Sequence, residues 1–180
     1  MKSETKAKLY YRDEYHFQKS VNPNNIYIYG YISSLQPKNL FEFGCNVGRH
    51  LNEFKKQGID VSGIDVSARA IELGRELYGL ENIRVGDERS LKNEKTIYDV
   101  VYVNSVLCHI DNIDDIIVDL KKISKTIIIF EAPYKVPSQK TNMSEFWYPR
   151  DYSVYGFKKL WSFYTESCDA IYCLYKFQNG

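Results

Sequence analysis

The sequence predicts an α/β fold, in which a mostly parallel sheet is covered by helices on both faces. Five short runs, nearly all apolar, alternate with helical patterns along the 180-residue chain. Strands that are apolar throughout are typical of a parallel sheet buried on both sides. Polar residues follow the carboxyl end of each run, which is the edge where open α/β sheets bind ligands.

The first strand, turn and helix form the most informative stretch. An apolar run at Asn39–Phe43 is followed by Gly44 and Gly48. Three apolar residues at helical spacing come directly after: Val47, Leu51 and Phe54. Strand, glycine turn and helix in this order present backbone N–H groups to a bound cofactor. The turn is not a P-loop, because no Gly-Lys-Ser/Thr follows, and it lacks the third glycine of a dinucleotide fingerprint.

A second strand is predicted at Asp60–Asp65, and Ser67 is predicted to cap a helix over Ala68–Tyr78. In dinucleotide folds an acid about 20 residues past the glycines binds ribose hydroxyls, because a carboxylate can accept both hydrogens of the diol. Asp65 follows Gly44 at about this distance. It is therefore a candidate ligand for a nucleoside sugar.

The other parallel strands are predicted at three apolar runs: Asn82–Val85, Tyr98–Val103 and Thr126–Phe130. Polar residues follow each run, namely Asp87 and Glu88, then Asn104 and Ser105, then Glu131. Between the last two runs, a helix is predicted from one apolar face made of Ile113, Ile116, Ile117, Leu120 and Ile123. The polar residues should meet at the carboxyl edge of the sheet.

These elements resemble the class I S-adenosylmethionine-dependent methyltransferases of small-molecule type, over roughly Leu40 to Pro133. The signature is an acid-x-Gly-x-x-x-Gly turn, an acid ending each of the next two strands, and a polar segment after the fourth. Here these are the stretch Glu42–Gly48, Asp65, Asp87 and the stretch Asn104–Ile110. The resemblance implies a Rossmann-like sandwich, with a mostly parallel seven-stranded sheet, an antiparallel last strand and helices on both faces.

The resemblance also implies that S-adenosyl-L-methionine is the cofactor. The residues implied to bind it are Glu42, Gly44, Cys45, Asn46, Gly48, Asp65, Val66, Asp87, Glu88, Asn104 and Ser105. The glycine turn would line the methionine moiety and the sugar, and Asp65 would hold the ribose diol. Val66 would pack on the adenine ring, near Asp87. The Asn104 carbonyl would accept from the methionine ammonium. Asn46 stands where the fuller family pattern has its middle glycine.

His109 is the candidate catalytic base, because a neutral imidazole with a pKa near about 6.5 can take a proton from a hydroxyl or amine. The alternative for His109 is a capping or packing residue. Glu131 and Asp111 are weaker candidate bases, and Asp111 is expected to cap the helix that follows it. Aromatic residues crowd the two ends of the chain, and a wall of them would exclude water and favour a sulfonium. The acceptor-binding candidates are Tyr11, Tyr15, Trp147 and Tyr148. Two roles are left open for Arg150: it either binds an anionic group of the acceptor or is a solvated surface charge.

Length and composition predict a single domain over residues 1–180. Its parts would be a helical lid at 1–36, a cofactor-binding core at 37–133, and an acceptor-side segment with a closing hairpin at 134–180. The hairpin strands are expected at Gly156–Phe163 and Cys168–Phe177.

A formal net charge of +1 with scattered lysines argues against a nucleic-acid partner. No apolar run approaches the ~20 residues of a membrane span. The cysteines form no C-x-x-C pair and no cluster with histidine, which argues against a metal site and fits a reducing cytoplasm. The expected reaction is methyl transfer to oxygen or nitrogen of a small polar metabolite, and the oligomeric state stays open. Two alternatives remain: a non-catalytic S-adenosylmethionine-binding regulatory or partner protein, and a nucleotide-sugar or NAD-binding domain.

Overall fold

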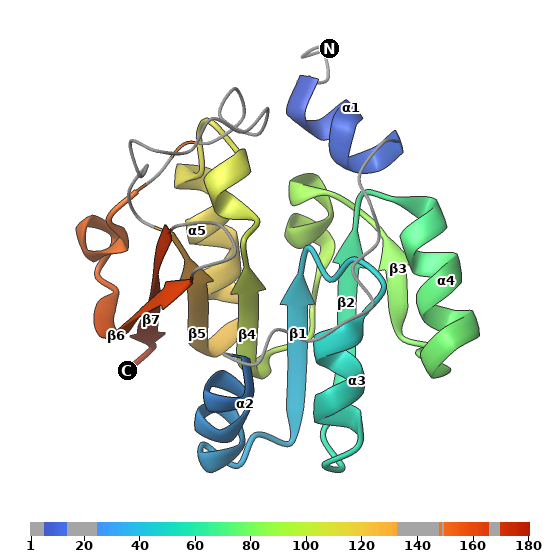
Figure 1. Ribbon diagram of the computed structural model, residues 1–180, viewed down its shortest axis with the longest axis horizontal. Helices are drawn as coiled ribbons and strands as arrows, with labels where there is room; N and C mark the ends of the chain where they lie inside the picture. The colour runs from blue at the N-terminus through green and yellow to red at the C-terminus, as the bar shows by residue number, and fades with distance from the viewer. Residues whose placement is uncertain (1–5, 14–24, 133–147, 149, 166–169) are drawn as a thin grey trace.

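The computed structural model describes residues 6–13, 25–132, 148, 150–165 and 170–180 (Figure 1). Its centre is a seven-stranded sheet with the order β3-β2-β1-β4-β5-β7-β6. The strands are β1 (Asn39–Phe43), β2 (Asp60–Asp65), β3 (Ile83–Val85), β4 (Tyr98–Asn104), β5 (Ser124–Glu131), β6 (Lys158–Thr165) and β7 (Ala170–Gln178). β7 is antiparallel to β5 and β6, and the other neighbouring pairs are parallel. The expected mostly parallel sheet with an antiparallel last strand is confirmed.

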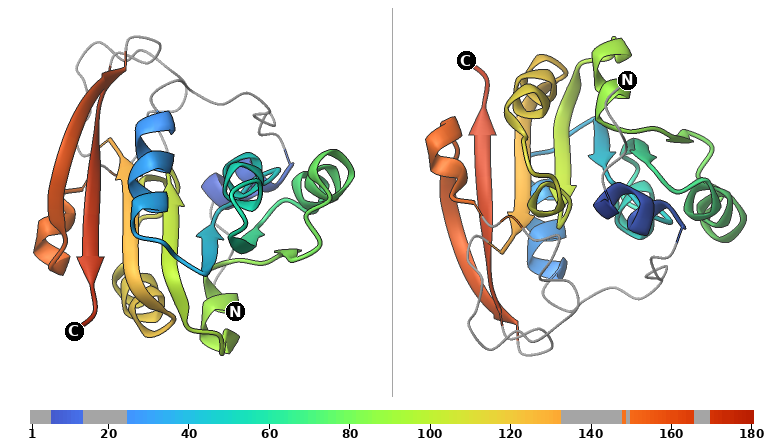
Figure 2. Two further views of the ribbon diagram at one scale, coloured as in Figure 1. Left: turned by 90° about the horizontal axis from the view of Figure 1, so that it is seen from below. Right: turned by 90° about the horizontal axis from the view of Figure 1, so that it is seen from above.

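Helices cover both faces of this sheet, as expected (Figure 2). One face carries α2 (Asn25–Ser34), α3 (Arg49–Lys55) and α4 (Ala68–Tyr78), and the other carries the short 3-10 helix η1 (Glu88–Asn93) and α5 (Asp114–Lys122). Each layer buries its own apolar cluster against the strands. The first cluster includes Ile28, Leu51 and Ile71, and the second includes Leu91 and Leu120.

Local signals place most of the element ends. The Ser67 hydroxyl accepts from the backbone N–H of Ala70 at 3.2 Å, so α4 begins at the predicted cap. α5 begins differently, because the side chain of Asn112, and not of the expected Asp111, accepts from the N–H of Asp114 at 3.0 Å. β6 starts two residues later than Gly156, since that glycine has φ 83° and ends a preceding turn.

The amino-terminal segment divides between two positions. α2 packs on the sheet, where Ile28, Tyr29 and Ile32 are buried. α1 (Lys6–Asp13) lies beyond the carboxyl ends of β1 and β2 in Figure 1, and in Figure 2 it overlaps α3. A lid role for residues 1–36 therefore stays a prediction for the part that precedes α2. None of the described helices has the length and apolar character of a membrane span.

The topology gathers the predicted site at one edge. β1 lies between β2 and β4, so the chain runs outward in opposite directions from the two sides of β1. Open α/β sheets bind ligands at such a switch point, outside the carboxyl ends of the strands. The Gly44 turn, Asp65 and Asn104 come at the ends of these three strands.

Candidate active site

The turn after β1 is hydrogen-bonded to the end of β2. The N–H groups of Gly44 and Cys45 both donate to the Ile64 carbonyl, at 2.9 and 3.0 Å. Three residues of the turn have left-handed backbone, with φ of 76° at Gly44, 50° at Asn46 and 72° at Gly48. Asparagine is one of the few side chains that tolerate this conformation. The turn therefore keeps its shape although Asn46 replaces the family's middle glycine.

Asp65 joins this turn to the start of α4. Its Oδ2 accepts from the Asn46 N–H at 2.8 Å, and its Oδ1 accepts from the Ser67 N–H at 2.9 Å. Burial raises the pKa of the Asp65 carboxyl, and hydrogen bonds from three backbone N–H groups oppose the shift. A carboxylate offers about four acceptor positions, so capacity remains for a further donor.

Glu42 lies beneath the turn with an unused acceptor. It is paired in register with Tyr102 of β4 and is 1% exposed. Among the described residues, its Oε2 and the Tyr102 hydroxyl are buried without a hydrogen-bond partner. Burial raises the pKa of Glu42, while the Arg49 charge opposes the shift. Because an unpaired buried oxygen is costly, Glu42 is a place where an ammonium group or a water molecule is needed.

His50 connects three elements and is absent from the predicted site. Its Nδ1 lies 2.6 Å from the Tyr29 hydroxyl, and its Nε2 lies 2.9 Å from Nδ2 of Asn104. The Arg49 Nε–H, which can only donate, lies 3.2 Å from the same Nε2, so Nε2 is the acceptor and the amide nitrogen of Asn104 faces it. Nδ1 then carries the proton. One signal was available: His50 stands four residues before Phe54, on the apolar face of α3.

Glu131 anchors the segment that follows β4. Its Oε1 accepts from the N–H groups of Val106 and Leu107 at 2.7 and 2.6 Å. Its Oε2 accepts from the Cys108 N–H at 2.9 Å and from the Tyr152 hydroxyl. The sequence made Glu131 a secondary candidate base. A fully buried carboxylate with four donors acts instead as a structural anchor.

The anchored segment carries His109. It contains the short 3-10 helix η2 (Leu107–His109), and His109 is half-buried there. Tyr148 lies beside it, because its N–H donates to the Cys108 carbonyl at 2.6 Å. Of the other acceptor candidates, Tyr11 belongs to α1, and Tyr15 and Trp147 lie outside the described residues.

Asp87 stands at the same edge, near Asp65. β3 pairs with β2, and the Gly86 N–H donates to the Asp65 carbonyl at 2.9 Å. Asp87 caps η1: its Oδ1 accepts from the Arg89 N–H at 3.0 Å. The neighbouring Glu88 and the adenine candidate Val66 are half-buried. The edge thus brings the predicted cofactor residues of four strands together.

Comparison with known proteins identifies the family. The family model described as methyltransferase domain matches residues 27–167. The chain belongs to this methyltransferase family. The expected S-adenosylmethionine-dependent methyltransferase is thereby confirmed, in place of a nucleotide-sugar or NAD-binding domain.

Solved structures share the fold of this methyltransferase. Magnesium protoporphyrin IX methyltransferase (ChlM) from Synechocystis PCC 6803, with bound SAH, is 15% identical with a TM-score of 0.66, over 88% of each chain. The PH0226 protein from Pyrococcus horikoshii OT3 is 16% identical with a TM-score of 0.64, over 95% of each chain. The methyltransferase domain of bacterial CtHen1 is 15% identical with a TM-score of 0.62, over 88% of this chain and 100% of the other. No curated protein sequence matches significantly.

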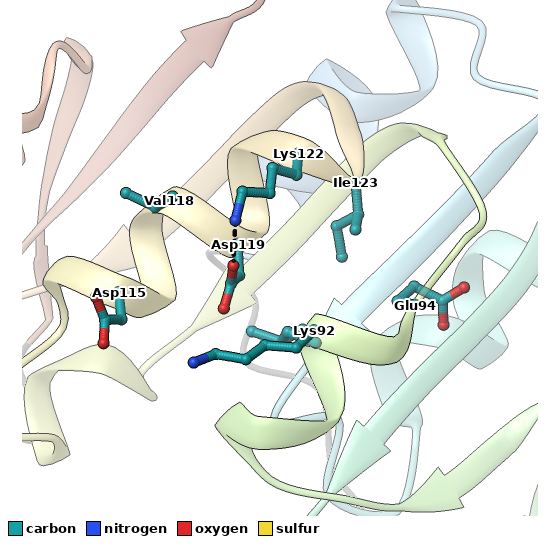
Figure 3. Close-up of a pocket in the computed structure, with 8 residues that line it drawn as sticks. Lys92, Glu94, Asp115, Val118, Asp119, Lys122 and Ile123 are labelled. Carbon is teal, nitrogen blue, oxygen red and sulfur yellow. Dashed lines mark hydrogen bonds and ion pairs between the residues drawn. The ribbon is translucent and has the colours of Figure 1, made fainter.

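A hollow of about 340 Å³ lies elsewhere in the methyltransferase, between η1 and α5 (Figure 3). Its charged lining is mixed, with Lys92 and Lys122 beside Glu94, Asp115 and Asp119 (Figure 3). Asp119 already accepts from Lys122 at 2.8 Å. This balance favours no one ligand chemistry. Among the described residues, no group of three or more His, Cys, Asp or Glu side chains could hold a metal ion.

The neutral state of His50 makes the stability of the methyltransferase depend on pH. Burial, together with the Arg49 charge, lowers the pKa of His50 well below 6.5. Between the lowered folded pKa and about 6.5, the unfolded chain binds a proton that the folded protein does not. The stabilisation is therefore complete above about pH 6.5 and is lost as the pH falls below it, by up to about 1.4 kcal/mol per pH unit.

Urea denaturation at two pH values tests this expectation. From about pH 7.5 to about pH 5.5, the wild type should lose about 1 kcal/mol more of its free energy of unfolding than His50→Gln. Glutamine retains an amide for the Asn104 contact but has no group that titrates here. Equal losses in the two proteins would show that His50 is not held neutral.

Proposed function

We propose that this methyltransferase transfers the methyl group of S-adenosyl-L-methionine to an oxygen or nitrogen atom of a small polar metabolite, in the cytoplasm. The main support is the hydrogen bond between Asp65 and the left-handed turn that begins at Gly44, together with the unpaired buried oxygen of Glu42. These groups offer a close backbone approach, an acceptor for a diol and an acceptor for an ammonium. The three described cysteines, Cys45, Cys108 and Cys173, are free thiols, as a reducing compartment requires.

The residues fit the cofactor in named roles. Asp65 accepts from the ribose diol, and the Asn104 carbonyl accepts from the methionine ammonium. Glu42 satisfies its buried oxygen with that ammonium through a water molecule. Gly44 and Asn46 are the half-buried part of the turn and meet the cofactor, while Cys45 and Gly48 are buried and support it from below. Val66, Asp87, Glu88 and Ser105 complete the adenine and sugar side.

The bound cofactor supplies an electrophilic methyl group. The protein must then hold the acceptor atom in line with the methyl group. Such orientation alone can lower the activation barrier by several kcal/mol. His109 takes the proton of the attacking hydroxyl or amine. Tyr148 stands beside it, and Tyr11, Tyr15 and Trp147 are proposed to complete the acceptor wall.

A small acceptor is favoured over a nucleic acid. The formal net charge is +1, so the chain has no strong positive electrostatic potential that would attract a polyanion. The structurally similar ChlM is named for a small-molecule acceptor, magnesium protoporphyrin IX. RNA binding would contradict this part of the proposal if an RNA oligonucleotide bound more tightly at lower salt concentration and did not compete with any small acceptor.

Asp65→Ala tests the cofactor site. The variant should bind S-adenosylhomocysteine more weakly by about 1.5–3 kcal/mol, the scale of hydrogen bonds to a charged group. Isothermal titration calorimetry measures the change. Asp60→Ala is a matched control, because Asp60 is an exposed aspartate at the opposite end of the same strand. Unchanged affinity in a folded Asp65→Ala protein would remove Asp65 from the site.

A further inference from the structure

Arg150 donates only to backbone carbonyls in the contacts that the structure shows. Its Nη1 donates to the carbonyls of Leu107 and Tyr148 at 2.7 and 3.2 Å. Its Nη2 donates to the Ile110 carbonyl at 2.5 Å and to that of Asp111. Each terminal nitrogen has two N–H groups, so all four are used. Arg150 is therefore neither the anion ligand nor the solvated charge that its sequence position allowed.

Three of these carbonyls flank His109 on both sides. The segment from 106 to 111 has few bonds of its own, chiefly the N–H groups of His109 and Ile110 donating back to Val106 and Leu107 at 3.0 and 3.1 Å. The Cys108 carbonyl accepts from the Tyr148 N–H, and six other backbone groups of the segment bind two charged side chains from other parts of the chain. The N–H groups at its start point to Glu131, and the carbonyls at its end point to Arg150.

The signs of these charges suit a helical turn. Backbone dipoles place partial positive charge at the start of a turn and partial negative charge at its end. A carboxylate at the start and a guanidinium at the end stabilise that arrangement together. The planar fork of arginine can reach several carbonyls at fixed angles, which a lysine ammonium on a flexible stem cannot reproduce.

We infer that Arg150 is a positioning residue that fixes where the His109 imidazole stands at the carboxyl edge. The inference rests on the proposed function, because it concerns the base proposed there. Arg150 touches neither cofactor nor acceptor in this account. It acts through the backbone on either side of His109, so its loss displaces the imidazole and leaves the cofactor contacts of β1 and β2 in place.

Histidine NMR can follow this position. The chain has only 3 histidines, and His109→Gln identifies the His109 ring signal by its loss. In the wild type, adding S-adenosylhomocysteine should move that signal. In Arg150→Gln the movement should fall to less than about half, while the Kd for S-adenosylhomocysteine stays within about threefold. The matched control is Arg75→Gln, because Arg75 also donates to a backbone carbonyl, that of Ile83 at 2.7 Å, away from this turn.

Arg150→Lys separates position from charge and replaces the glutamine variant if that protein does not fold. It keeps the positive charge and loses the fork, so we expect the same reduced response. A full His109 response in a folded Arg150→Gln or Arg150→Lys protein would overturn the inference.

One measurement does not depend on the cofactor. Without ligand, the His109 ring signal of Arg150→Lys should differ from that of the wild type, and Arg75→Gln should leave it unchanged. Failure of the wild type to bind S-adenosylhomocysteine would refute the proposed function. An unmoved His109 signal in the free Arg150→Lys protein would instead refute the positioning role.

Discussion

Replacing Glu131 by glutamine is expected to lower the free energy of unfolding by about 3 kcal/mol or more. Glu131 is 0% exposed and accepts three backbone N–H groups and the Tyr152 hydroxyl. Glutamine offers one oxygen, and its NH₂ group would face the donors that the second carboxylate oxygen now satisfies. Each buried donor left without an acceptor costs about 1–3 kcal/mol. In a chain of this size the melting temperature should fall by about 10 °C, which a thermal melt followed by circular dichroism measures.

Glu72→Gln is the matched control for this loss. Glu72 is exposed and pairs with Arg69 on the surface of α4, and such ion pairs contribute about 0–1 kcal/mol. The same amide substitution should therefore leave the melting temperature nearly unchanged there. Equal effects at Glu72 and Glu131 would contradict the anchoring role.

Replacing Gly44 by valine is expected to weaken S-adenosylhomocysteine binding by more than about a hundredfold while the sheet stays folded. At φ 76° a side chain strains the backbone, by about 1–2 kcal/mol for an ordinary residue. A Cβ atom at Gly44 would also lie 2.3 Å from Cγ2 of Val106, so the turn and the segment after β4 must separate. These are the two segments that the proposal places around the methionine end of the cofactor.

Gly58→Val separates the clash with Val106 from the strain of a left-handed side chain. Gly58 has φ 80°, and a Cβ atom there meets nothing within 4 Å. Both variants carry the strain of a left-handed side chain, but only Gly44→Val displaces Val106. Calorimetric titration should therefore find normal S-adenosylhomocysteine binding in Gly58→Val. Similar binding by the two variants would mean that the turn at Gly44 does not shape the cofactor site.

The sequence alone determined the sheet and the edge that is proposed to bind the cofactor, because their signals are local. The bounds of β1, β2 and α4 follow from apolar runs, a glycine turn and a serine cap, all within a few residues of each end. The position of Asp65 at the end of β2 follows from the same run. Parallel strands share one carboxyl edge, so the gathering of these residues needed no further information.

The tertiary structure decided how Asn104 and the His109 segment are held at this edge. His50 meets Tyr29 and Asn104, residues 21 and 54 positions away along the chain. Arg150 binds the carbonyls of residues that lie 39 to 43 positions earlier in the chain. Backbone carbonyls and N–H groups are the same at every residue, so a side chain that binds them has no partner that the sequence can identify. Only the packing of β4 and β5 brings Glu131 and this segment within hydrogen-bonding distance.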